Sequence, residues 1–395
     1  MPSRARALVV LPLASLAALA LSSCGALVDA PSSSSSVAAS DGASGGADAS
    51  VAINATDTAC EVAKTDLPGG VTTFSITNGG SQVTEVYVYD GDRIVTEKEN
   101  IGPGTSYDLT VDLTEGKYEV ACKPGMVGDG IRQAIAVTGG STELTAAEQT
   151  AVDAYRAYVQ QQADATVPLV QQLRDAIAAG DRAKAQSLYA PSRVGWESVE
   201  PVAESFGDLD PRMDIREADL EPGQQFTGWH RLEKALWQNE DLAAVVPVAD
   251  QLLLDVKELA QRVPNAAITP NSIGNGAKEL LDEVATGKIT GEEEAFSHTD
   301  LVDFKGNVDG AQKAFEVLTP IVQTADPKLV TELTTQFAAV QAALAPYADA
   351  TGPAASGGYV SYDTVTEEQR RELARVVDAL SEPLSQLGAA AAGQA

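Results

Sequence analysis

One short segment combines residue types that can bind a metal ion. Residues 228–237, GWHRLEKALW, contain His230 and Glu233, and His230 is one of only two histidines in the 395-residue chain. On a helix, a spacing of three residues places two side chains about 60° apart, so both can reach the same atom. One imidazole combined with carboxylates suits iron or manganese better than copper, and zinc also accepts this set.

The helical spacing also predicts where these side chains point. His230 and Glu233 fall inside or at the rim of an apolar stripe of Trp and Leu residues, whereas Arg231 points away. A carboxylate directed into a core is costly unless a cation or a hydrogen-bond donor meets it. A metal ion is one such partner. The alternative is that the two residues satisfy each other, or that Glu233 pairs with a Lys or Arg of a neighbouring helix.

The N-terminal residues have the features of an export signal. Arg4 and Arg6 precede an apolar run over 7–21 that is too short to span a membrane, and LSSC ends at Cys24. This ending resembles a bacterial lipobox, which predicts a signal peptide over 1–23 and lipidation at Cys24. The alternative is an ordinary secretory peptide with an incidental cysteine. Residues 24–50, rich in Ser, Ala and Gly, are expected to form a flexible stalk.

Two patterns divide the remaining chain. From 51 to 140, short alternating runs rich in Val, Thr and Tyr are separated by Gly-containing turns, which predicts a small antiparallel β-sandwich or barrel. Thr145, followed three residues later by Glu148, has the spacing of a capping box. From there to residue 395 the apolar residues recur at helical spacing, which predicts an all-α bundle.

Composition limits the class of function. The formal net charge is −29 and the pI is near 4.3. Nucleic-acid binding depends on a basic surface, so this composition argues against it and favours cationic ligands.

Several separated blocks resemble a known family. The helical part is similar to the imelysin, or peptidase M75, domain, whose signature is GxHxxE; the similar blocks are 189–210, 226–237, 248–262 and 289–313. The β part resembles a cupredoxin-like domain. The combination is similar to the extracytoplasmic components of bacterial iron-uptake systems, and the resemblance covers roughly residues 55–390.

The resemblance implies a metal site in the helical domain. It assigns His230 and Glu233 as ligands, with Asp250 in the segment ADQL as a third. Acidic residues of 197–204 or 292–294 could complete the ligand set, although 292–294 could equally be an acidic first turn of a helix. His298 is interpreted as a structural or capping residue. The resemblance favours iron as the metal.

The resemblance also implies a second metal site, in the β domain. It assigns Cys60, Glu85 and Cys122, with Glu61 or Met126 as auxiliary ligands, to copper or iron. The alternative is a disulfide between the two cysteines, because exported proteins commonly oxidise such pairs. A blue-copper centre needs two histidines, and neither histidine of the chain lies in residues 51–140, which excludes that centre.

The resulting expectation is an exported, lipid-anchored iron-binding protein on the outer face of the cell membrane. The resemblance implies delivery of iron to an EfeU-like permease and cooperation with an EfeB-like haem peroxidase. The alternative is a metallopeptidase, but the sequence lacks an HExxH motif, and no G-x-S-x-G motif occurs after residue 50. A structural or polysaccharide-binding surface protein is a third hypothesis.

Overall fold

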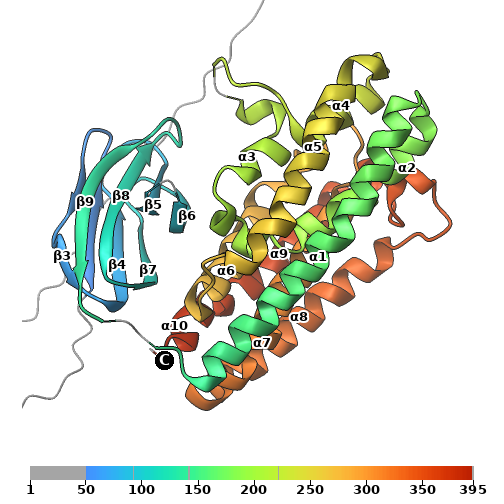
Figure 1. Ribbon diagram of the computed structural model, residues 1–395. Coiled ribbons are helices and arrows are strands. Elements are labelled where there is room, and N and C mark those ends of the chain that lie inside the picture. Colours follow the sequence, from blue (N-terminus) through green and yellow to red (C-terminus); the bar gives the residue numbers. More distant parts are fainter. Residues whose placement is uncertain (1–49, 92, 141–142, 221, 394–395) are drawn as a thin grey trace, which may run out of the picture. The chain divides into compact units, whose positions relative to one another are not determined.

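A computed structural model of the chain describes residues 50–91, 93–140, 143–220 and 222–393 (Figure 1). The predicted signal peptide, Cys24 and almost all of the predicted stalk lie outside these residues. Within the described ranges, no helix combines the length and the apolar composition that crossing a bilayer requires.

Residues 51–138 form a sandwich of two β-sheets, as the alternating pattern predicts. The four-stranded sheet has the order β2 (Cys60–Val62), β1 (Val51–Ala55), β4 (Gly70–Asn78) and β7 (Ser106–Leu113). The five-stranded sheet has the order β3 (Asp66–Pro68), β9 (Ile131–Thr138), β8 (Gly116–Pro124), β5 (Thr84–Asp90) and β6 (Arg93–Ile101). Alternate residues such as Val51, Ile53 and Ala55 point into the shared core.

The sandwich is not wholly antiparallel, which differs from the prediction. β1 pairs in parallel with β4, and β3 pairs in parallel with β9. A hairpin turn joins only antiparallel neighbours, and parallel pairs need a longer connection. Here the chain passes from one sheet to the other between β1 and β4, so these partners are not consecutive strands.

The rest of the described chain is helical. The α-helices are α1 (Ala146–Ala178), α2 (Arg182–Glu197), α3 (Leu209–Met213), α4 (Gly228–Trp237), α5 (Leu242–Arg262), α6 (Pro270–Thr286), α7 (Asp300–Ala325), α8 (Pro327–Leu344), α9 (Glu367–Leu384) and α10 (Leu387–Ala391). Short 3-10 helices are η1 (Glu200–Phe206), η2 (Glu217–Asp219), η3 (Val263–Asn265), η4 (Lys288–Thr290), η5 (Ala345–Tyr347), η6 (Ala354–Ser356) and η7 (Tyr362–Thr364).

The predicted helix start is confirmed. The Thr145 hydroxyl accepts from the Glu148 backbone N–H at 3.3 Å, and the Glu148 carboxylate accepts from the Thr145 N–H at 2.6 Å. This capping box satisfies two backbone donors that the first turn of α1 would otherwise leave without partners.

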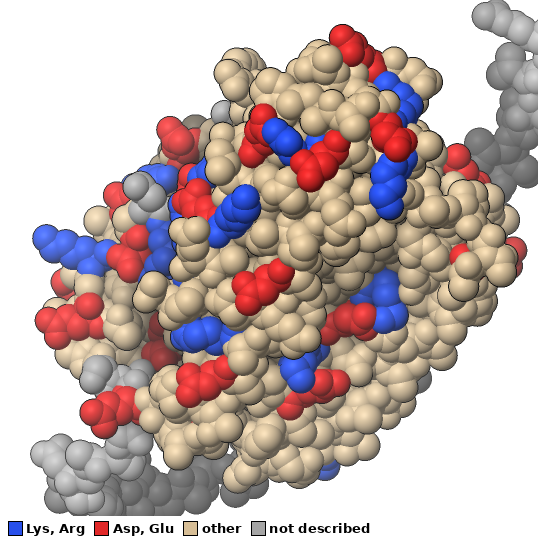
Figure 2. All heavy atoms as spheres, turned by 45° about the vertical axis from the view of Figure 1, so that its right-hand side comes forward, with Lys and Arg blue, Asp and Glu red and all other residues tan. Residues whose placement is uncertain are grey.

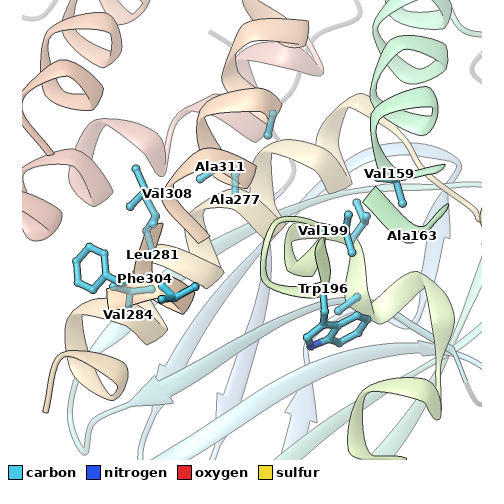
Figure 3. Close-up of a cluster of buried hydrophobic side chains, with 14 of the residues drawn as sticks. Val159, Ala163, Trp196, Val199, Ala277, Leu281, Val284, Phe304, Val308 and Ala311 are labelled. Carbon is cyan, nitrogen blue, oxygen red and sulfur yellow. The ribbon is translucent and has the colours of Figure 1, made fainter. Parts of the chain in front are cut away.

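Small and large apolar side chains alternate in the helical core. Figure 3 shows Ala277 of α6 and Ala311 of α7 near the larger Val308 and Leu281. Gly306 of α7 allows an even closer approach, because a Cβ atom there would lie 2.7 Å from the Cβ atom of Glu197 on α2. This close packing places polar residues of α7 beside the end of α2, where the candidate site lies.

One face of the molecule carries charges of both signs. On the face drawn in Figure 2, Lys and Arg side chains lie interspersed with Asp and Glu. A basic stripe of the kind that tracks a phosphate backbone is not visible on this face.

Candidate metal centre

The helix α4 turns His230 and Glu233 inward, as the helical spacing predicts. His230 is 2% exposed and Glu233 is 1% exposed. Arg231 points outward and pairs with Glu240 at 2.7 Å. Trp229 is fully buried and donates its indole N–H to the hydroxyl of Ser192 at 3.1 Å, so it packs in the core beside the site.

The glycine of the GWHRLE segment has a specific role. Gly228 has a φ of 72°, and a Cβ atom there would lie 2.0 Å from the backbone oxygen of Met213. Only glycine combines this left-handed conformation with such a close approach. The contact brings the C-terminal end of α3 against the first turn of α4. As a result, Asp214 lies beside His230.

Both imidazole nitrogens of His230 face carboxylates without forming hydrogen bonds. Nε2 lies 3.3 Å from an oxygen of Asp214 and 3.6 Å from Glu293. Nδ1 lies 3.6 Å from Glu233 and 3.9 Å from Glu294. Buried polar groups normally form hydrogen bonds, so a buried imidazole that faces acceptors without forming any is suited to bind another partner, such as a metal ion.

Glu233 is held by one oxygen and leaves the other free. Its Oε1 accepts the backbone N–H groups of Phe296 at 2.8 Å and Ser297 at 2.7 Å. Its Oε2, which faces His230, is buried and has no hydrogen-bond partner. Burial raises the pKa of Glu233, but His230 and these backbone donors outweigh it and lower the pKa, so the group is an anion. An oriented carboxylate with one open oxygen has the properties of a metal ligand.

The groups near His230 form overlapping candidate ligand sets. In each set the potential ligand atoms lie within 4.8 Å of one another. Among the described residues the sets are His230, Glu233 and Glu294; Asp214, His230 and Glu293; and Glu197, Glu200 and Asp214. Of these, Glu197, Glu200, Glu293 and Glu294 belong to the acidic stretches that the sequence named as possible ligands.

Two buried cations hold the carboxylates together. Arg193 of α2 is fully buried and contacts Glu294 at 2.9 Å, as well as Asp214 and Glu197. Burial lowers the pKa of Arg193, but the surrounding carboxylates, Asp214 first, raise it well above the usual value. A buried charge is stable only when it is paired, and Arg193 and the acids satisfy this condition for each other.

Lys288 is the second buried cation, and it pairs with carboxylates at the other end of the cluster. Its Nζ lies 3.2 Å from Glu197 and 3.1 Å from Glu200. Asn307 of α7 donates its amide N–H groups to the same carboxylates, and its Oδ1 is buried without a partner. Carboxylates outnumber these cations, and burial raises the pKa of Glu200 and Glu294 well above the usual value, so a metal ion that binds them would displace their protons.

The charge of His230 follows from these neighbours. Burial and Arg193 lower its pKa, but the nearby Glu233, Glu293 and Asp214 raise it to about 9. At neutral pH the metal-free imidazole therefore carries a proton. A metal ion must displace that proton in order to bind.

The structure does not bring Asp250 to this centre. Asp250 lies on the partly exposed side of α5, and its carboxylate accepts from Arg174 at 2.6 Å. It belongs to none of the ligand sets formed by the described residues. His298 also lies apart, 3.5 Å from Asp363 near the surface.

Asp214, Arg193 and Lys288 are residues of the candidate centre that the sequence did not reveal. Asp214 follows a five-residue helix and has no local pattern that distinguishes it from any other loop aspartate. The two cations are separated by 95 positions in the chain and meet only through tertiary packing. Gly228 is the sequence signal that bears on Asp214, because a glycine at the start of a helix can indicate close backbone packing. Here Gly228 packs against Met213, and this contact positions Asp214.

In the β domain, the structure selects the disulfide from the alternatives that the sequence left open. Cys60 and Cys122 form a disulfide with a Cα–Cα distance of 5.5 Å. A disulfide has no thiolate to offer a metal ion. Glu85 is buried and lies 3.9 Å from Lys123. The described residues therefore do not assemble the second metal site expected from Cys60, Glu85 and Cys122.

Comparisons with known proteins agree with this architecture. The imelysin (peptidase M75) family matches residues 151–387, and the cupredoxin-like domain family matches residues 16–137. The chain is 38% identical to the protein named iron uptake system component EfeO from Escherichia coli strain K12, over 346 residues. The proteins of the same name from Shigella flexneri and from Escherichia coli O157:H7 are equally similar, and each alignment covers 85% of this chain and 90% of the relative. The chain therefore belongs to the imelysin (peptidase M75) family and carries a cupredoxin-like domain ahead of its imelysin domain.

Proposed function

We propose that this protein is an extracytoplasmic iron-binding protein that captures iron at the His230 centre and delivers it to a membrane iron permease. The observation that carries the proposal is the buried imidazole of His230, which has two nitrogens without hydrogen bonds and carboxylates facing both. Its neighbour Glu233 keeps one oxygen free for the same ion.

The ligand chemistry supports iron. The centre offers one imidazole and several carboxylate oxygens, and it includes no sulfur ligand among the described residues. Hard oxygen-rich sets of this kind suit iron and manganese better than copper. The names of the relatives, which describe components of iron uptake, point to the same metal.

The predicted export signal and lipid anchor of the N-terminal sequence support delivery of iron at a membrane. Export and lipidation at Cys24, followed by the stalk of 24–50, would hold the iron-binding part near a permease at the outer face of the cell membrane. The partners in this proposal are an iron permease and a haem peroxidase of the same uptake system.

The geometry gives less support to a peptidase. A peptide bond must reach the metal and a general base, but His230 and Glu233 are almost fully buried. Glu233 also uses one oxygen to accept two backbone N–H groups, which favours a ligand role over proton transfer to a substrate.

The two histidines allow a matched test. Equilibrium binding of ferrous iron under anaerobic conditions, and of ferric citrate in air, is measured for wild type, His230→Asn and His298→Asn. Asparagine suits position 298, where φ is 56°. We expect His230→Asn to weaken binding at least about 100-fold and His298→Asn to bind like wild type.

Folding and peptidase activity are checked in the same samples. Circular dichroism verifies that the variants are folded, and a fluorogenic peptide library tests for cleavage. Equal iron binding by wild type and folded His230→Asn would refute the proposed centre. Peptide cleavage lost in His230→Asn would favour the peptidase.

A further inference from the structure

The metal centre is closed to direct access from solvent. His230, Glu233 and Glu294 are at most 2% exposed, and Glu293 is 5% exposed. An ion that has lost most of its hydration shell needs charged groups along its way, because bare charge is costly in an apolar interior. A route to the centre therefore requires a cavity that carries charged groups and whose wall reaches the ligands.

One cleft meets this condition. It has a volume of about 550 Å³ and lies between residues of β5 and β6 on one side and of η1 and α6 on the other. Ten of its described lining residues are acidic, and one, Arg216, is basic. The acidic residues are Glu85, Glu97, Glu99, Glu200, Glu204, Asp210, Asp219, Glu279, Glu283 and Glu292.

Protein groups neutralise the carboxylates of the cleft only in part. Oε2 of Glu97 is buried and has no hydrogen-bond partner. Burial, followed by the charge of Glu99, raises the pKa of Glu204 to about 7. Burial and the nearby Glu293 also raise the pKa of Glu283 to about 7, although Lys288 opposes them. A cavity with these properties attracts cations.

Two lining residues of the cleft also touch the centre. Glu200 belongs to the ligand set with Glu197 and Asp214, and Asp214 lies 3.3 Å from Nε2 of His230. Arg216 donates to Glu293 at 3.2 Å, and the other oxygen of Glu293 faces His230 at 3.6 Å. Glu200 and Arg216 thus connect the cleft to the centre, and the buried Lys288 contacts Glu200 at 3.1 Å and Glu293 at 3.6 Å beside them.

We propose that the iron ion reaches the His230 centre through this acidic cleft, passing from Glu200 to Asp214. On this route Arg216 acts as a plug, which means that its guanidinium competes with the ion for the carboxylate of Glu293. The proposal rests on the proposed function. It assigns Arg216 a role in the rate of loading, because its positive charge repels an approaching cation and occupies a carboxylate of the centre.

Arg216 is suited to move. Its side chain is 25% exposed, and besides Glu293 it contacts Asp219 at 2.6 Å and Glu292 at 3.5 Å. Those two carboxylates are about half exposed and could hold the guanidinium when an ion displaces it from Glu293.

Stopped-flow binding of ferrous iron under anaerobic conditions tests the plug. The signal is the fluorescence of the three tryptophans, one of which, Trp196, donates to Asp214 at 2.8 Å. We expect Arg216→Gln to associate about tenfold faster than wild type, since it removes a positive charge from the route. Arg212→Gln removes the same charge from a side chain outside the cleft, which pairs with Asp208, the buried Asp255 and Glu258. We expect its association rate to match wild type.

A steric variant tests the route independently of charge. Thr286 is exposed and lines the cleft, whereas Thr335 is exposed on α8. We expect Thr286→Phe to slow association and dissociation by the same factor, with an unchanged dissociation constant, and Thr335→Phe to have no effect.

The outcomes separate this proposal from the proposed function. Equal association rates in Arg216→Gln and Arg212→Gln overturn the route and its plug. If Arg216→Gln does not fold, unchanged association in Thr286→Phe overturns the route. A fluorescence change that is the same in wild type and folded His230→Asn overturns the proposed function itself.

Discussion

At the scale of single residues, the carboxylates around His230 determine how its imidazole would bind a metal ion. Its nitrogens face carboxylates at 3.3–3.9 Å, which raise its pKa to about 9. A metal ion and a proton therefore compete for the same imidazole. The lower pKa of Glu233 keeps this candidate ligand ionised, whereas burial and the charge of Glu233 raise the pKa of Glu294 well above the usual value, so His230 and Glu294 would both release protons to a metal ion.

We predict that the affinity for ferrous iron rises with pH. Only the neutral imidazole binds, so below a pKa of about 9 the apparent dissociation constant should fall by roughly tenfold or more for each pH unit. Calorimetry at pH 7 in buffers of different ionisation enthalpy should show the release of about one proton or more for each ion bound. An affinity that does not change between about pH 6 and 8 would contradict this account.

At the scale of elements, α4 is positioned by its first residue. Gly228 lets the helix start against the end of α3, so that His230 and Asp214 meet. The neighbouring α7 reaches the end of α2 through Gly306 in a comparable way. The centre is therefore assembled from helices whose close contacts depend on the absence of a side chain.

We predict that Gly228→Ala weakens both the fold and iron binding. The left-handed conformation alone costs about 1–2 kcal/mol for alanine, and the clash with Met213 adds to it. Gly223→Ala is the matched control, because Gly223 has a φ of 94° but a Cβ atom there would meet no other atom within 4 Å. Urea unfolding and iron titration of both variants check the prediction. Equal losses of iron affinity in the two would show that the contact with Met213 does not position the centre.

The sequence predicted those parts of the site that lie on one helix. His230 and Glu233 share a turn, so their spacing shows that they converge. Asp250, the predicted third ligand, lies on the next long helix, but its position on α5 turns it toward Arg174. Asp214 comes from a loop, and its position depends on tertiary contacts that periodicity does not encode.

The same distinction applies to the fold. Period-two runs predicted the sandwich, and helical spacing predicted the bundle, because both patterns are local. The parallel pairing of β1 with β4 was not predicted, since strand partners that are distant in sequence leave no local signal.

At the scale of the whole molecule, the β domain and the helical domain make different contributions. The described ligand sets come entirely from the helical domain. The disulfide joins β2 of one sheet to β8 of the other, so it links the two layers of the sandwich. Lys98 of β6 pairs with Glu279 at 3.1 Å and Asp282 at 2.7 Å on α6, which connects the two domains.

We predict that replacing both Cys60 and Cys122 by serine reduces stability without affecting the iron centre. Loss of a native disulfide should cost about 2–5 kcal/mol, measured by urea unfolding of the β domain. The stoichiometry and affinity of iron binding should stay within about twofold of wild type, because the centre lies in the other domain. A loss of one bound ion per chain would instead support a metal site at the two cysteines.

The most direct test of the central claim is anomalous diffraction at the iron absorption edge from crystals grown with iron. The account predicts a peak in contact with His230 and Glu233, with further ligands among Asp214, Glu293 and Glu294. Crystals of iron-loaded protein with no peak at these residues, or with iron only at the surface, would contradict it.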